Sequence, residues 1–207
     1  MYSHLKTLLI IFLVCLCSYF NIFKDPFQFD GVRYIKENPY IIGLVEKNNY
    51  QAFFSEFSLT NIFNRPFLNY TYAINFYLGK DNTLGYHLVN LLIHFANCLL
   101  VYLIARKTIV LLDVNSNVLR CQFNMPLVAA LIFASHPAQT QTVTYIISRS
   151  ASLSTLLYLS SFNCFLIALY KIELRSSTQS KLSIYGMIVL SLLLMRIALG
   201  VKLTVAV

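Results

Sequence analysis

The sequence lacks tryptophan and holds few charged residues, which make up 12% of its 207 positions. It contains no run of five basic residues, although Lys and Arg outnumber Asp and Glu by 16 to 8. Nucleic acid is therefore not an expected partner, because it usually demands a basic tract or patch. Hydrophobic residues make up 57% of the chain, and mean hydropathy is +0.64. These values are typical of an all-α integral membrane protein with several spans in contact with lipid.

The five cysteines form no CxxC pair and show no Cys/His ligand spacing, so no metal site is expected from them. Most of them lie in apolar segments, where cysteine packs as a small apolar side chain. His87 and His94 lie about 10 Å apart along one helix axis, so these two histidines cannot bind one metal ion together. The sequence leaves open whether a divalent metal takes part elsewhere.

Five apolar segments predict about five transmembrane or re-entrant helices. Short flanks rich in Lys and Arg put the N-terminus in the cytoplasm and one long loop, residues 24–85, on the extracytoplasmic side. A cleaved signal peptide is the alternative for the first segment, but no small-x-small cleavage site follows it. The expected spans are residues 5–23, 86–104, 126–136, 150–170 and 182–207.

The second span carries a polar stripe. His87, Asn90, His94 and Asn97 are spaced three, four and three residues apart, so they share one helical face. Lipid does not tolerate such groups, and we expect the stripe to face other protein or a water-filled cavity. The stripe could contact a ligand or form hydrogen bonds between helices, and the sequence leaves both alternatives open. His87 and Asn90, nearer the extracytoplasmic end, are the candidates for ligand contact.

Other polar residues near the expected extracytoplasmic surface are candidates for chemistry. Asp30 suits a general base acting on a hydroxyl acceptor; the alternative is a solvated loop acid or an Asx turn. Arg65 is a candidate to bind the phosphate of a donor; the alternative is that its side chain reaches lipid headgroups. His136 and Arg149 are candidates to bind a phosphate leaving group; the alternative is that they cap helices and anchor them at the membrane interface.

Four blocks of sequence together resemble a known family in their order and spacing. They are FDGVRYIKENP, RPFLNYTYAINFYLG, GYHLVNLLIHFANCLLVYLI and LVAALIFASHPAQTQTVTYIISRSASLSTLLYL. They resemble the membrane domain of the transmembrane-and-tetratricopeptide-repeat family, which are C-type glycosyltransferases similar to protein O-mannosyltransferases. The resemblance covers about Phe27–Leu159, and the spelling Tyr-Ile-Ile-Ser-Arg-Ser resembles bacterial members.

The resemblance implies a glycosyltransferase that moves a mannose-like sugar from a polyprenyl-phosphate carrier to a protein or other hydroxyl acceptor. Transfer is expected on the extracytoplasmic face of a bacterial inner membrane, with the endoplasmic reticulum membrane as the alternative. Asp30 is the expected base. The expected substrate-binding residues, including those predicted from the residues alone, are Arg65, His87, Asn90, His136, Gln139, Arg149 and Lys202.

The sequence also departs from the family. Gly31, Gln141 and Ala151 stand where the family usually has acids. The repeat domain is absent and the chain stops within an apolar run, so residues 1–207 are expected to be a partial membrane domain, and its activity is open. The alternatives are a non-catalytic, degenerate relative or scaffold, and a small transporter built on the polar stripe, for which no internal repeat is found.

Overall fold

The computed structural model describes residues 2–28, 30–46, 65–111, 124–173 and 181–202. The described residues form helices and no strand, which confirms the all-α class. The helices, with η for short 3-10 or π turns, are α1 (Tyr2–Tyr19), η1 (Phe20–Lys24), η2 (Val32–Lys36), α2 (Pro39–Glu46), α4 (Pro66–Gly79), α5 (Thr83–Leu111), α6 (Met125–Ser135), η4 (Pro137–Gln139), α7 (Thr140–Thr144), η5 (Ile146–Ser148), α8 (Arg149–Glu173) and α9 (Lys181–Val201).

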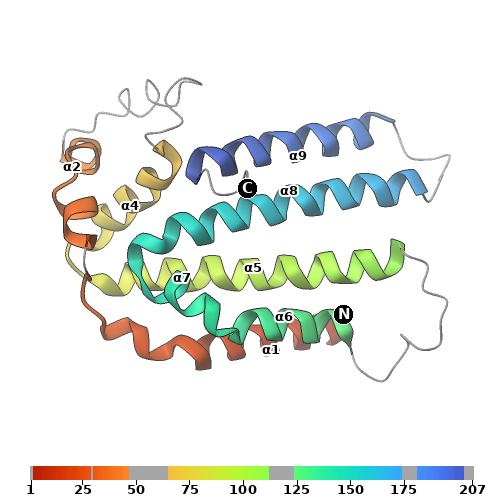
Figure 1. The fold of residues 1–207 in the computed structure, drawn as a ribbon, viewed down its shortest axis with the longest axis horizontal. Coiled ribbons are helices and arrows are strands. Elements are labelled where there is room, and N and C mark those ends of the chain that lie inside the picture. Colours follow the sequence, from red (N-terminus) through yellow and green to blue (C-terminus); the bar gives the residue numbers. More distant parts are fainter. Residues whose placement is uncertain (1, 29, 47–64, 112–123, 174–180, 203–207) are drawn as a thin grey trace.

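Among these residues, four segments are long and apolar enough to cross a membrane. They are Leu5–Lys24, Thr83–Leu111, Ile146–Ile172 and Lys181–Val201. The long helices run side by side along the length of the molecule (Figure 1). The apolar helix α6 has only 11 residues, about 16 Å at 1.5 Å per residue, so it cannot cross a hydrocarbon core of about 30 Å by itself.

The helix α5 packs against α1, α6 and α8, and this position explains its polar stripe. His87, Asn90, His94 and Asn97 are all at most 2% exposed. The prediction that the stripe faces other protein is therefore confirmed. The outer faces of the bundle, by contrast, expose large apolar side chains such as Leu182 of α9, at 81%, as a surface in lipid requires.

The predicted loop over residues 24–85 contains helices that fold onto one end of the bundle. Both α2 and α4 begin with proline, which suits a first helical position because the N–H that it lacks has no partner there. Glu37 and Asn38 lie between η2 and α2, and Pro39 is the first residue of α2. Arg65 lies directly before α4, whose first residue is Pro66.

One apolar cluster joins seven elements at this end, which we call the pocket end. Its buried members come from η2, α2, α4, the first turn of α5, η5, the first turns of α8, and the last residue of α9. They are Ile35, Ile41, Leu68, Tyr72, Ala73, Tyr86, Ile146, Leu153 and Val201. Segments far apart in the sequence therefore meet where the sequence places most of the candidate residues.

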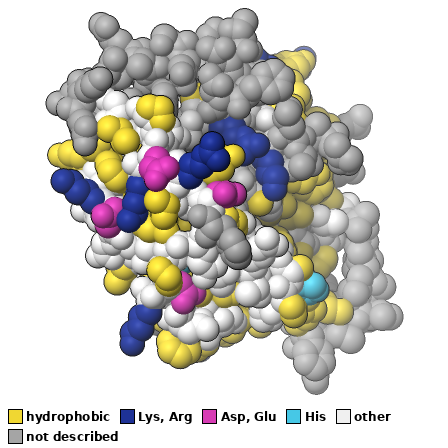
Figure 2. Space-filling model, turned by 60° about the vertical axis from the view of Figure 1, so that its left-hand side comes forward, with side chains coloured by type: hydrophobic (Ala, Val, Ile, Leu, Met, Phe, Trp, Pro, Cys, Tyr) yellow, Lys and Arg dark blue, Asp and Glu magenta, His cyan; other side chains and the backbone are white. Residues whose placement is uncertain are grey.

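The two ends of the bundle differ in charge. The face at the pocket end carries Lys and Arg side chains interspersed with Asp and Glu (Figure 2). At the opposite end, where α5 and α8 finish and α1 and α9 begin (Figure 1), the charged residues of the described helices are basic except for Glu173, the last residue of α8. The basic residues there are Lys6, Arg106, Lys107, Lys171 and Lys181.

Candidate functional site

A cavity of 520 Å³ lies at the pocket end, and we call it the Asp30 pocket. Its lining comes from η2 and the residues on either side of that turn. Five of the lining residues follow at intervals of three, one, three and one, so they share one helical face. The lining residues are Asp30, Arg33, Tyr34, Glu37, Asn38 and Pro39.

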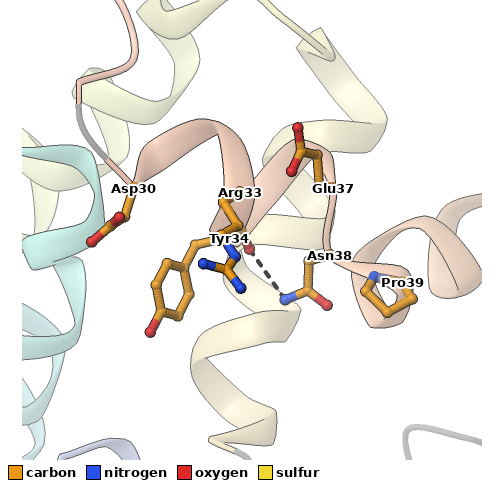
Figure 3. A pocket seen from close by; sticks show the side chains of 6 residues that line it. All are labelled: Asp30, Arg33, Tyr34, Glu37, Asn38 and Pro39. Atoms are coloured by element: carbon orange, nitrogen blue, oxygen red, sulfur yellow. Dashed lines mark hydrogen bonds between the residues drawn. The ribbon is translucent and has the colours of Figure 1, made fainter.

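The Asp30 pocket combines two carboxylates with one guanidinium. Arg33 lies between the side chains of Tyr34 and Asn38, while the carboxylates of Asp30 and Glu37 point to different sides (Figure 3). The Asn38 side-chain amide donates to the carbonyl oxygen of Tyr34, at 3.1 Å. The pocket therefore offers both an acceptor for a proton and a cation for a phosphate.

Asp30 is exposed, and its carboxylate has no hydrogen-bond or ion-pair partner among the described residues. Its carbonyl oxygen accepts from the backbone N–H of Tyr34 at 2.9 Å, which holds the turn. A second link fixes this segment, because Lys36 forms an ion pair with Asp81 at 2.9 Å just before α5. The carboxylate of Asp30 is therefore free to meet a ligand on a segment tied to the bundle.

His87 lies beneath the segment that leads to the Asp30 pocket. It is 1% exposed, and its Nε2 is 3.1 Å from the carbonyl oxygen of Asp25. Its Nδ1 has no hydrogen-bond partner among the described residues. His87 therefore contacts the backbone where η1 ends and does not line the pocket.

Asn90 and Arg149 bind one another inside the bundle. Arg149 is fully buried, and its Nε donates to Oδ1 of Asn90 at 2.8 Å. Its Nη1 and Nη2 donate to the carbonyl oxygens of Thr71 and Tyr86, each at 3.1 Å. Each of the three guanidinium nitrogens donates to protein, so Arg149 joins α4, α5 and α8, and the fully buried group does not line the Asp30 pocket.

Tyr72 extends this network. The ring of Tyr72 lies 4.6 Å from the Arg149 guanidinium carbon, a distance typical of a cation–π contact. Its hydroxyl donates to the carbonyl oxygens of Ile146 and Ile147, at 3.1 and 3.2 Å. Burial raises the pKa of Tyr72, against the opposing effect of the Arg149 charge, so the phenol stays protonated and remains a donor.

The other four predicted residues do not line the Asp30 pocket. His136 is exposed, and its Nδ1 accepts from the backbone N–H of Ala138 at 3.1 Å, which is the capping alternative. Gln139 is half-buried at the end of η4. Arg65 is exposed before α4 with a left-handed φ of 49°, and Lys202 is half-buried directly after α9.

Sequence reasoning missed five of the six pocket residues, namely Arg33, Tyr34, Glu37, Asn38 and Pro39. The signal was the interval of three and four residues that begins at Asp30. The stretch lies within the predicted loop over residues 24–85, and helical spacing has no structural meaning in a loop.

Comparison with known proteins identifies relatives of the chain. It is 27% identical to a protein O-mannosyl-transferase of Caenorhabditis elegans, over 76% of this chain and 22% of that protein. It is 29% identical to the protein O-mannosyl-transferase Tmtc3 of Drosophila melanogaster, over 77% of this chain and 19% of that protein. It is 27% identical to the human protein O-mannosyl-transferase TMTC3, over 77% of this chain and 17% of that protein.

No family model and no solved structure matches the chain. The chain spans about a fifth of the length of the curated relatives that it matches. The resemblance predicted from the four sequence blocks is confirmed by these relatives.

Proposed function

From this homology to the TMTC protein O-mannosyl-transferases, we propose that the chain forms the sugar-transferring membrane portion of a glycosyltransferase. The donor is a mannose-like sugar on a polyprenyl-phosphate carrier, and the acceptor is a protein hydroxyl. The observation that supports the proposal is the Asp30 pocket, which the Asp30 carboxylate and the Arg33 guanidinium both line at one end of four membrane-length helices. A lipid-linked donor needs a polar site at such a position, because its carrier stays in the bilayer.

In the proposed step, the acceptor oxygen attacks the anomeric carbon of the sugar, and its proton passes to Asp30 as general base. The bond between the anomeric carbon and the phosphate oxygen breaks, and polyprenyl phosphate leaves with that electron pair. A cation beside the leaving phosphate stabilises the charge that develops there. Arg33 supplies it, since Arg149 is bound within the protein.

The same reasoning gives the other predicted residues distinct roles. His87 is a positioning residue, because it holds the backbone that leads to the pocket, and Asn90 and Arg149 hold α4, α5 and α8 together at the same end. Arg65 and Lys202 lie at the pocket end and serve carrier or headgroup phosphates. His136 and Gln139 stay candidates for acceptor contact at the surface.

We further propose that the pocket end is extracytoplasmic. The basic residues at the opposite end support this orientation, because cytoplasmic flanks are enriched in Lys and Arg. The three relatives reported above are animal proteins, which favours the endoplasmic reticulum membrane over the bacterial inner membrane.

The test is sugar transfer by membranes that contain the chain, with polyprenyl-phosphate mannose as donor and a Ser/Thr-rich peptide as acceptor. We expect Asp30→Asn to lower the transfer rate by 10²-fold or more, since general bases contribute about 10²–10⁴-fold. Asp25→Asn is the matched control, because it removes a carboxylate outside the pocket and keeps the carbonyl oxygen that His87 contacts.

Equal rates for Asp30→Asn and the unmodified chain would exclude Asp30 as the base. Donor binding without transfer in the unmodified chain would favour the alternative of a non-catalytic relative.

A further inference from the structure

Three residues with metal-ligating side chains meet inside the bundle. None of them belongs to the Asp30 pocket or to the Arg149 network. They are Cys15 of α1 and His94 and Cys98 of α5, each at most 1% exposed. The two Sγ atoms are 3.7 Å apart, and Nε2 of His94 is 3.7 Å from Sγ of Cys98. All three ligand atoms lie within 4.8 Å of one another.

The Cys15–Cys98 and Cys98–His94 distances match those between ligands of one tetrahedral metal ion, and the third pair lies within 4.8 Å. Zn–S bonds of about 2.3 Å and Zn–N bonds of about 2.05 Å put two sulfurs roughly 3.8 Å apart, and a sulfur and a nitrogen roughly 3.6 Å apart. A disulfide needs sulfurs at about 2.05 Å. The observed separations of 3.7 Å are therefore close to those that a shared metal ion requires.

Charge selects the ion. Two thiolates, a neutral imidazole and a divalent cation sum to zero, whereas a monovalent cation such as Cu⁺ would leave one uncompensated negative charge. An uncompensated charge inside an apolar bundle is costly. We propose that Cys15, His94 and Cys98 bind a zinc ion, with the two thiol protons released to solvent as the metal enters.

The helix and its neighbours orient this site before any metal binds. His94 and Cys98 are four residues apart on α5, so they project from one face on successive turns. The His94 ring meets the edge of Tyr19, with centroids 5.3 Å apart, and stacks on Phe133 at 5.7 Å. The expectation that the sequence holds no Cys/His ligand spacing is therefore wrong for this pair.

The zinc-bound state has one defined cost. Nε2 of His94 also lies 3.1 Å from the carbonyl oxygen of Ala134, which suits a protonated Nε2. Zinc takes the lone pair of Nε2 in the tautomer protonated at Nδ1, so the carbonyl loses this donor. The same carbonyl oxygen then offers a fourth ligand, and the site would join α1, α5 and α6.

The test is the metal content of the full chain, purified in detergent after growth with zinc and dialysis against a weak chelator. We expect about one zinc ion per chain, and at least a fivefold lower content in Cys98→Ser and His94→Gln, which each remove a ligand. Cys17→Ser is the matched control, since Cys17 lies on the same helix as Cys15 but is exposed. It should keep the metal.

A second measurement covers the case in which the ligand variants fail to fold. Cobalt(II) added to the unmodified chain and to Cys17→Ser should produce a thiolate-to-cobalt charge-transfer band that zinc abolishes. The proposal is overturned if the unmodified chain takes up no zinc and shows no such band. A Cys15–Cys98 disulfide in the non-reduced protein would also overturn it.

Discussion

At the scale of single residues, the chain uses its buried polar groups mainly to hold backbone. The donors of His87 and Arg149 reach carbonyl oxygens of Asp25, Thr71 and Tyr86. A buried donor lowers the free energy of the fold only while its acceptor is in place, and an unpaired one is costly. Changes at these residues should therefore alter stability and pocket shape before they alter chemistry.

Arg149→Met should lower the free energy of unfolding by roughly 3 kcal/mol, because it leaves a buried side-chain oxygen and two carbonyls without this donor. Thermal unfolding in detergent measures the change. The free energy of unfolding of Arg149→Lys should lie between those of Arg149→Met and the unmodified chain, since an ammonium keeps the charge but not the planar set of donors. The exposed Arg65→Met is the control, and an equal loss of stability there would contradict this role for Arg149.

At the scale of elements, the Asp30 pocket depends on a short helical segment tied to α5. The ties are His87 to the carbonyl of Asp25 and Lys36 to Asp81. The ion pair is partly exposed, so it contributes at most about 1 kcal/mol. The buried His87 contact should therefore matter more for the position of the segment.

His87→Phe should loosen residues 25–37 while α5 stays intact, because the ring keeps its volume but loses its hydrogen bond. Hydrogen exchange of the backbone amides in that segment should rise about fivefold, the factor for a bond of about 1 kcal/mol. His136→Phe, at an exposed position, should leave this exchange unchanged. Unchanged protection in His87→Phe would mean that other contacts fix the segment.

The sequence predicts periodic features well and the candidate site only in part. The burial of the polar stripe follows from its spacing and from the cost of polar groups in lipid. The carbonyl partners of Arg149 could not be predicted. Every residue has a backbone carbonyl, so the sequence does not show which carbonyls of separate helices accept from Arg149. The pocket residues beside Asp30 were missed because the helical character of residues 30–46 depends on packing against α4 and α9, as Ile35 and Val201 show.

At the scale of the whole molecule, the described bundle has a mixed-charge end with a pocket and a basic opposite end. This asymmetry predicts that the two ends face different sides of one membrane.

Cysteine reporters test that orientation. In sealed vesicles with the cytoplasmic face outward, a membrane-impermeant maleimide should label Arg106→Cys and leave Lys80→Cys unlabelled until detergent is added. The unmodified chain gives the background from its own cysteines. Labelling of Lys80→Cys before detergent would put the pocket end in the cytoplasm.

The central claim is that the Asp30 pocket receives the lipid-linked sugar. Its most direct test is photo-crosslinking of the membrane-embedded chain with a photoreactive polyprenyl-phosphate mannose, followed by mass spectrometry of the labelled peptides. The account predicts that the label falls within residues 30–39, is displaced by unlabelled donor, and is reduced in Arg33→Gln. Displaceable label confined to residues 136–149, with none in the pocket, would contradict it.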